Sequence, residues 1–549
     1  MPSLETAVEY HEATKHHPTR LARSLGYLDW DNQPNPFRRF AGTPTLTLPL
    51  AKGEPGPSYA ALYHPGAVEP RPVNRNTIGL FLECSLAISA WKRYKHAQWS
   101  LRVNPSSGNL HPTEGYLVCG PTGGIDGAPG VYHYAPKEHA LEQRASFDAD
   151  AWAALIHGFP PHTFLMGLTS IHWRESWKYG ERAYRYCQHD AGHALGALVF
   201  GARVLGWRTV VLSGLGDETI SALLGLDRDE DFPVVLEREA PELVAAIVPG
   251  PWDGVVPRTP PGGAIDAVAA GDWRGKAEPL SADHVDWTII EAVDKACRKP
   301  ATEEAGAPCA HDLRPAPETG GPSAYRIIRQ RRSAVDMDGL TGLERTVFYR
   351  MLARLMPGED AIPWSSLGKP AAVHPVFFVH RIEDLPPGLY ALPRSDAGEQ
   401  ALREELSDGF QWRLAEDCPE GLPFYLLAPG NCESVAADVS CTQAIAGEGA
   451  FAVAMLAEFS AMLERHGPWF YRRLHWEAGL LGQILYLEAE AAGVRSTGIG
   501  CFFDDMVHEL LGLEGLTFQT LYHFTVGGPV DDPRLTTLPA YGESRRTGA

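Results

Sequence analysis

The chain has 549 residues, a formal net charge of −20 and nine cysteines without Cys-x-x-Cys spacing. Its length predicts two domains, its charge argues against general affinity for nucleic acid or anionic membranes, and its cysteines favour reduced thiols over a zinc or disulfide framework. No apolar run approaches the roughly 20 residues of a membrane span and no secretory signal opens the chain, so we expect a cytoplasmic protein without a metal site.

The first informative segment in chain order is the loop of residues 102–112, which leads into an expected strand at residues 114–119. Pro105 fixes the backbone φ angle, and Gly108 admits a backbone shape that other residues resist. Between them lie small side chains, hydroxyls and N–H groups. Such a loop can press against a flat heteroaromatic ring and hydrogen-bond its edge.

A helical pattern follows and carries a lysine and a tyrosine side by side, Lys178 and Tyr179. A lysine among cationic neighbours can lose its proton and act as a base, and a tyrosine can relay a proton. The alternative is structural, with Lys178 facing solvent and Tyr179 packed under a helix.

Residues 256–322 are rich in Pro, Gly and Ala and are predicted to be a linker that contains one helix, at about residues 283–297. This segment separates a first half, residues 1–255, from a second half, residues 323–549.

The second half contains three further motifs. Residues 329–333 read Arg-Gln-Arg-Arg-Ser and follow a short helical run, and arginine is suited to bidentate contact with phosphate. Residues 493–503 form a glycine-rich turn after a long apolar helix. Residues 526–534 close the pattern and end in Arg534.

The two halves repeat one pattern, with strand pairs followed by long helices. A constant offset of 287 residues places Gly180, Tyr184, Arg185, Ala191, Gly192, Gly206 and Arg208 on Gly467, Tyr471, Arg472, Ala478, Gly479, Gly493 and Arg495. Identity at fixed spacing predicts a tandem duplication, and long helices with short strand pairs predict an α+β fold.

The loop of residues 104–112 resembles the flavin-ring loop of the nitroreductase-like FMN oxidoreductases, in the form found in their SagB/azoline-dehydrogenase branch. The resemblance implies that each half is a mostly antiparallel sheet flanked by helices, and that the halves pack as an internal pseudo-dimer. It also implies bound FMN, held by Arg102, Pro105, Ser106, Ser107, Gly108, Asn109, Arg331, Arg332, Ser333, Gly498, Ile499, Gly500 and Arg534. In azoline dehydrogenases a Lys-Tyr pair is linked to proton removal, which makes Lys178 and Tyr179 the candidate catalytic residues.

Each half keeps a different part of this site. The second half has only residues 368–372 where the first has its ring loop, and the first half lacks clear phosphate motifs, residues 11–17 being a candidate degenerate counterpart of Arg-Arg-Ser. If the halves pair as nitroreductase subunits do, the chain has one composite FMN site, and the other pseudo-site is empty or repurposed.

The expected function is hydride transfer between FMN and a small-molecule or peptide-derived, azoline-like substrate. Two alternatives stay open. One is a nitro or quinone reductase with NAD(P)H as a transient electron donor. The other is a catalytically silent flavin- or peptide-binding partner in a biosynthetic complex. Pairing of the pseudo-dimer into a further homodimer is also open.

Overall fold

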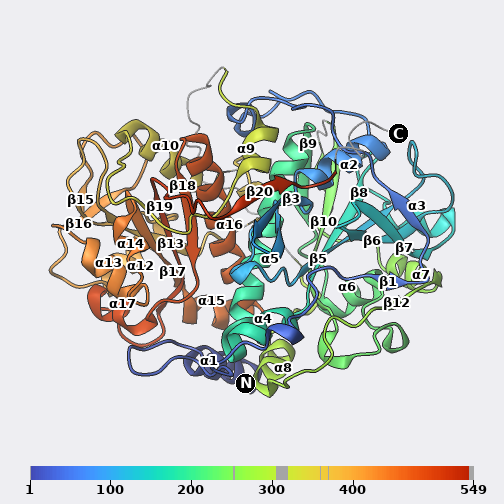
Figure 1. Cartoon of the computed structure of the whole chain (residues 1–549), viewed down its shortest axis with the longest axis horizontal. Coiled ribbons are helices and arrows are strands. Elements are labelled where there is room, and N and C mark those ends of the chain that lie inside the picture. Colours follow the sequence, from blue (N-terminus) through green and yellow to red (C-terminus); the bar gives the residue numbers. More distant parts are fainter. Residues whose placement is uncertain (1, 251–253, 304–319, 359, 369, 543–549) are drawn as a thin grey trace.

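The computed structural model describes residues 2–250, 254–303, 320–358, 360–368 and 370–542. Two α+β halves lie side by side, with their long central helices between them (Figure 1), and the predicted fold class is confirmed. None of the helices within these ranges is both long and apolar enough to span a bilayer.

Each half is built on an antiparallel sheet. The first sheet runs in the order β11 (Asp272–Trp273), β7 (Ala140–Ser146), β6 (Gly130–Ala135), β5 (Thr113–Cys119), β8 (Phe164–Ser170), β10 (Ala240–Pro249) and β9 (Trp207–Val211), with β2 (Thr45–Thr47) also paired to β7. The second runs in the order β15 (Arg413–Leu414), β16 (Tyr425–Pro429), β14 (Gly388–Ala391), β13 (Val373–Val379), β17 (Phe451–Glu458), β19 (Phe518–Gly527) and β18 (Arg495–Ile499).

Helices cover both faces of each sheet. The first half and the segment after it contain α1 (Pro2–Ala13), α2 (Arg75–Glu83), α3 (Ala149–Leu155), α4 (His172–Tyr179), α5 (Ala183–Arg203), α6 (Asp217–Leu224), α7 (Ala264–Ala269) and α8 (Thr288–Ala296). The second contains α9 (Ala324–Gln330), α10 (Arg345–Leu355), α11 (Trp364–Leu367), α12 (Asp396–Glu405), α13 (Glu433–Val439), α14 (Ile445–Glu448), α15 (Phe459–His466), α16 (Phe470–Ala491) and α17 (Asp504–Leu511).

The apolar core follows from strand alternation. In β5, Leu117 and Cys119 join a large cluster shared by both halves, whereas Tyr116 and Val118 face a separate cluster on the outer side of the first sheet. Successive side chains of a strand point to opposite faces, so a strand buried on both sides reads as a continuous apolar run.

The 287-residue repeat is visible in the structure. The starts of α4 and α15, α5 and α16, α6 and α17, and β8 and β17 all differ by this number of residues. The helices α5 and α16 cross where a glycine of each faces the other helix. A Cβ on Gly192 would lie 2.3 Å from the carbonyl oxygen of Trp476, and one on Gly479 would lie 2.3 Å from that of His189. Only glycine allows this backbone approach.

Two buried ion pairs cross between the halves and are related by the same repeat. Arg185 of α5 pairs with Asp504 of the second half at 2.8 Å, and Arg472 of α16 pairs with Asp217 of the first half. A buried charge is tolerated only when it is paired, so these contacts fix how the halves are arranged.

Residues 11–17 are not the counterpart of the Arg-Arg-Ser motif. The N–H of Asp504 donates to the carbonyl oxygen of His16, as the N–H of Asp217 donates to that of Lys299. The repeat therefore matches the end of α1 with the end of α8, and the two helices pack together.

The segment predicted as a linker has more structure than expected. Besides α8, it contains α7 and two short strands, β11, which pairs with β7, and β12 (Lys276–Ala277), which pairs with β1 (Phe40–Ala41). Ile265 and Val268 of α7 enter the outer cluster of the first half. The expected linker at residues 315–319 lies outside the described residues. We propose residues 1–255, 256–322 and 323–549 as the division of the chain, with the middle segment packed on the first half.

The C-terminal segment crosses back to the first half. Its strand β20 (Thr536–Pro539), red in Figure 1, pairs with β3 (Ile88–Tyr94), which pairs in turn with β4 (Ala97–Arg102). The Tyr541 hydroxyl then donates to the carbonyl oxygen of Pro136 at 2.7 Å. The second half thus adds a strand to the β3–β4 hairpin that leads into the predicted ring loop.

Candidate functional site

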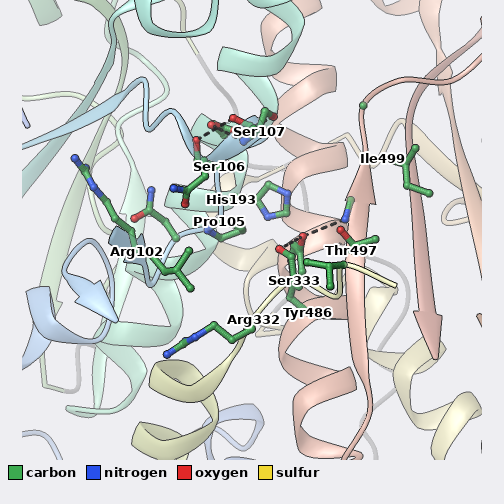
Figure 2. Close-up of a pocket in the computed structure, with 18 of the residues that line it drawn as sticks. Arg102, Pro105, Ser106, Ser107, His193, Arg332, Ser333, Tyr486, Thr497 and Ile499 are labelled. Carbon is green, nitrogen blue, oxygen red and sulfur yellow. Dashed lines mark hydrogen bonds between the residues drawn. The ribbon is translucent and has the colours of Figure 1, made fainter. Parts of the chain in front are cut away.

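A cavity of about 450 Å³ lies between the halves, within the range of small-molecule and cofactor sites. Figure 2 shows Arg102, Ser106 and Ser107 of the first half on one side and Ser333, Thr497 and Ile499 of the second half opposite. Its lining includes these predicted residues: Arg102, Pro105, Ser106, Ser107, Gly108, Asn109, Tyr179, Arg331, Arg332, Ser333, Gly498, Ile499 and Gly500.

The ring loop is held in shape by a buried carboxylate. Ser107 lies in a single helical turn in which Gly108 and Asn109 both have positive φ, 57° and 61°. Asp190 of α5 accepts hydrogen bonds from the backbone N–H and the hydroxyl of Ser107, each at 2.9 Å. The loop is therefore set by a partner from a distant helix, and Gly108 supplies a conformation that strains other residues.

Two carboxyl groups under the loop have unusual proton affinities. Burial raises the pKa of Asp190 to about 7, against the opposing hydrogen bonds from Ser106 and Ser107. Burial also raises the pKa of Glu175 well above its usual range, and the charge of Asp190 adds to this. Shifts of this kind are frequent where proton transfer takes place.

Lys178 and Tyr179 lie directly against the ring loop. A Cβ on Gly108 would be 2.5 Å from the Tyr179 hydroxyl oxygen and 3.1 Å from Lys178 Nζ. Tyr179 lines the cavity, whereas Lys178 lies behind Gly108 and is not among the lining residues. Burial raises the pKa of Tyr179 well above its usual range, so its hydroxyl stays protonated and can donate.

The opposite end of the cavity gathers the cations Arg331, Arg332 and Arg495, of which Arg495 pairs with Asp531 at 2.5 Å. Ser333 Oγ lies 2.9 Å from the Tyr486 hydroxyl, and the Arg331 guanidinium lies 4.8 Å from the centre of the same ring. Arg331 is 4% exposed, and its Nε and Nη1 have no hydrogen-bond partner among the described residues. Burial, with the charges of Arg331 and Arg329, lowers the pKa of Arg332 to about 9. Buried cations in this state favour an anionic ligand.

Two tyrosines explain the glycine-rich wall. A Cβ on Gly498 would lie 1.9 Å from the Tyr522 hydroxyl, and one on Gly500 would lie 2.4 Å from Cε1 of Tyr186. The Gly498 N–H donates to the hydroxyl of Tyr486 at 3.0 Å. Glycine is required here because the aromatic rings occupy the space of a side chain.

Arg534 is not brought to the cavity. Its side chain is 71% exposed and pairs at 2.8 Å with Asp532, which does line the cavity. The expected phosphate contact from Arg534 is therefore not formed, because a carboxylate two residues away holds the guanidinium. Lys92 and Arg495 line the cavity instead.

The sequence did not predict several lining residues, among them Tyr186, Asp190, His193, Tyr486 and Tyr522. The repeat contains a signal for Asp190. Its counterpart is Glu477, which accepts the backbone N–H of Ala372 at 3.1 Å in the degenerate loop of the second half. An acid at this position anchors the loop in both halves.

The second pseudo-site is filled by the chain itself. Val211 is the counterpart of Gly498, and Ser366 lies just before the degenerate loop. Arg258 Nη1 donates to the carbonyl oxygens of both residues, each at 3.1 Å. Arg258 therefore bridges, in the other half, the two segments whose counterparts line the cavity.

Two helix-flanked antiparallel sheets thus share a cavity between their halves. The family model described as "Nitroreductase family" matches residues 67–236 and 393–528, more than half of the chain, and the chain belongs to this family. No curated protein matches the sequence.

A solved structure supports the fold over nearly the whole chain. A putative nitroreductase from Anabaena variabilis has a TM-score of 0.68 and 21% identity over 96% of this chain and 99% of its own. A putative nitroreductase from Ralstonia eutropha has 15% identity and a TM-score of 0.28, over 42% of this chain and 97% of its own. The E. coli microcin synthetase McbBCD complex with truncated pro-MccB17 has 19% identity and a TM-score of 0.27, over 46% of this chain and 94% of the matched chain.

The residues of the cavity fit FMN, which members of this family generally bind. The unpartnered Nε and Nη1 of Arg331, with Arg332 and Ser333, provide cationic and hydroxyl donors for a phosphate. Tyr179, Tyr522 and Tyr186, which pack on the glycines at 108, 498 and 500, line the same cavity and provide flat aromatic surface beside it.

Proposed function

We propose that the protein is an FMN-dependent oxidoreductase of the SagB-like dehydrogenase type, with one composite FMN site per chain. Its substrate is a small-molecule or peptide-derived, azoline-like compound. Bound FMN would supply the hydride chemistry, because a flavin accepts and releases hydride without a set of catalytic protein groups.

The protein residues would divide the remaining work. Arg331, Arg332 and Ser333 would hold the phosphate, and the ring loop would fix the position of the flavin ring. The neutral hydroxyl of Tyr179, which lines the cavity, would relay the proton removed from the substrate to Lys178 Nζ, which lies behind Gly108.

The observation that carries the proposal is the contact of Lys178 and Tyr179 with Gly108, which joins the candidate base to the flavin-ring loop. We expect Lys178→Ala and Tyr179→Phe to retain FMN and to lose at least about tenfold in the rate of azoline oxidation. Lys295→Ala is the matched control, because this lysine is 62% exposed and pairs with Glu291 of its own helix. Full activity in both variants would remove the catalytic assignment.

The same preparations separate the remaining functions. We expect the bound flavin to keep its colour under anaerobic NAD(P)H and to be bleached by an azoline substrate. Rapid bleaching by NAD(P)H would identify a nitro or quinone reductase instead. Bound FMN that responds to neither would identify a silent binding partner.

A further inference from the structure

Two cysteines meet at the edge of the cavity. Cys501 follows Gly500 and lines the cavity, and Cys441 lies in the loop between α13 and α14. Both are partly exposed, and their thiols lie close enough for each to shift the pKa of the other. The two residues are separated by sheet strands in the sequence, so the fold alone brings the sulfurs together.

Hydrogen bonds hold the two cysteine segments against each other. Gln443 Nε2 donates to the carbonyl oxygens of Ser440, at 2.7 Å, and Cys501, at 2.9 Å. The N–H of Phe503 donates to the carbonyl oxygen of Val439 at 2.8 Å. The two thiols therefore lie between segments that hydrogen bonds hold together, and not between two free loops.

The turn that carries Cys441 is strained. Cys441 and its neighbour Thr442 have φ values of 55° and 57°, in the left-handed region that residues other than glycine rarely adopt. Consecutive residues in this region persist only when the surroundings impose them, and such positions are frequent at functional sites.

The surroundings of Cys501 favour a thiolate. His16 Nδ1 accepts the N–H of Ala22 at 2.9 Å, which leaves the imidazole proton on Nε2, the nitrogen free to donate to Cys501. The pKa of Cys501 is lowered to about 5, chiefly by the hydrogen bond from Cys441 and further by His16 and the charge of Arg182. Burial opposes this shift. The pKa of Cys441 is raised, chiefly by the same hydrogen bond. Cys441 therefore acts as the thiol that donates to the Cys501 thiolate.

The pair occurs only beside the complete cavity. The repeat places Gly214 at the position of Cys501, and the loop that matches Cys441, residues 156–163 between α3 and β8, contains no cysteine. The pair is thus absent where the site is degenerate.

We propose that Cys441 and Cys501 are a redox-active dithiol that forms an internal disulfide by exchange with the disulfide of a low-molecular-weight thiol. The Cys501 thiolate attacks one sulfur of the external disulfide and displaces one thiolate. Cys441 then loses its proton and attacks the Cys501 sulfur, which releases the second thiol. Two electrons pass from the cysteines to the external disulfide, which leaves as two thiols. This activity does not depend on the proposed flavin chemistry.

The test is incubation of the purified full-length protein with glutathione disulfide at pH 7, followed by thiol titration and peptide mapping by mass spectrometry. We expect a peptide that links Cys441 to Cys501, reversed by reduced glutathione. The Cys441→Ser variant should instead retain glutathione on Cys501, because the resolving thiol is gone. Glutathione retained on Cys501 of the unmodified protein, or both thiols left free, would overturn the proposal.

Cys418 is the internal control. It is also partly exposed, burial raises its pKa to about 11, and its thiol donates to the carbonyl oxygen of Leu422. At pH 6.5 we expect iodoacetamide to alkylate Cys501 at least about tenfold faster than Cys418, because the thiolate is the nucleophile. Equal rates would contradict the proposal. FMN content measured on the same samples separates this result from the proposed function, since either can fail without the other.

Discussion

The packing of the ring loop on the candidate catalytic pair can be tested with one methyl group. In Gly108→Ala the new Cβ would lie 2.5 Å from the Tyr179 hydroxyl oxygen, 3.0 Å from its Cε2 and 3.1 Å from Lys178 Nζ. The ring must therefore move into the cavity. The positive φ of 57° adds a backbone cost of about 1 kcal/mol for alanine.

Gly493→Ala is the matched control, because this glycine has a φ of 77° and no atom within 4 Å of the Cβ position. Both variants should lose about 1 kcal/mol of unfolding free energy from the backbone term. Only Gly108→Ala should also weaken FMN binding, by at least about tenfold or 1.4 kcal/mol. Urea unfolding and fluorescence titration of the apoprotein with FMN measure the two effects.

A second substitution identifies the cause. Tyr179→Phe removes the oxygen that the new methyl group would meet first, so the double variant should regain part of the lost FMN affinity, a coupling that a double-mutant cycle measures. Equal FMN affinity in Gly108→Ala and Gly493→Ala, or no recovery in the double variant, would refute the placement of Tyr179 against the loop.

Three further predictions concern charge. Arg331→Ala should weaken FMN binding about 10- to 100-fold in equilibrium titration, because it removes charge-assisted contacts to the phosphate. Arg534→Ala, at an exposed residue, should change FMN affinity by no more than about twofold. Equal losses would contradict the placement of the phosphate at Arg331. The pKa of Asp190 rises from 3.8 to about 7 on folding, so its contribution to the free energy of unfolding is greatest below pH 4 and is lost as the pH rises to 7. This contribution is on the order of 4 kcal/mol. Asp190→Asn should therefore flatten the pH dependence of urea unfolding between these values, and an unchanged slope would count against the shift. Arg472→Ala leaves Asp217 and Glu242 without their shared cation and should cost about 3–5 kcal/mol of unfolding free energy. Arg185→Ala should cost less, because Arg182 still pairs with Asp504. A larger loss for Arg185→Ala in thermal unfolding would disprove the role given to these ion pairs between the halves.

Much of the architecture could be predicted from the repeat. The offset of 287 residues holds for three helix starts and one strand start because these elements form the core, where an insertion would break packing on both sides. Gly192 and Gly479 fall on the helix crossing for the same reason. The pairing of the halves across one site needed the family resemblance as well.

Other features depend on contacts that local sequence does not encode. The strands β11 and β12 are two residues long and exist only through pairing with distant strands, so residues 256–322 read as a linker. Asp190 lies in a helix, and its role is set by a loop 83 residues earlier in the chain. The side chain of Arg534 is set by a local contact instead, because its guanidinium pairs with Asp532, two residues away, and does not reach the cavity.

The composite site is tested most directly by the FMN content of the purified and reconstituted protein, measured from the visible spectrum against protein concentration. One FMN per chain is the expected result, because the cavity needs both halves and Arg258 bridges the counterparts of its walls. Two FMN per chain, or none after reconstitution, would contradict it.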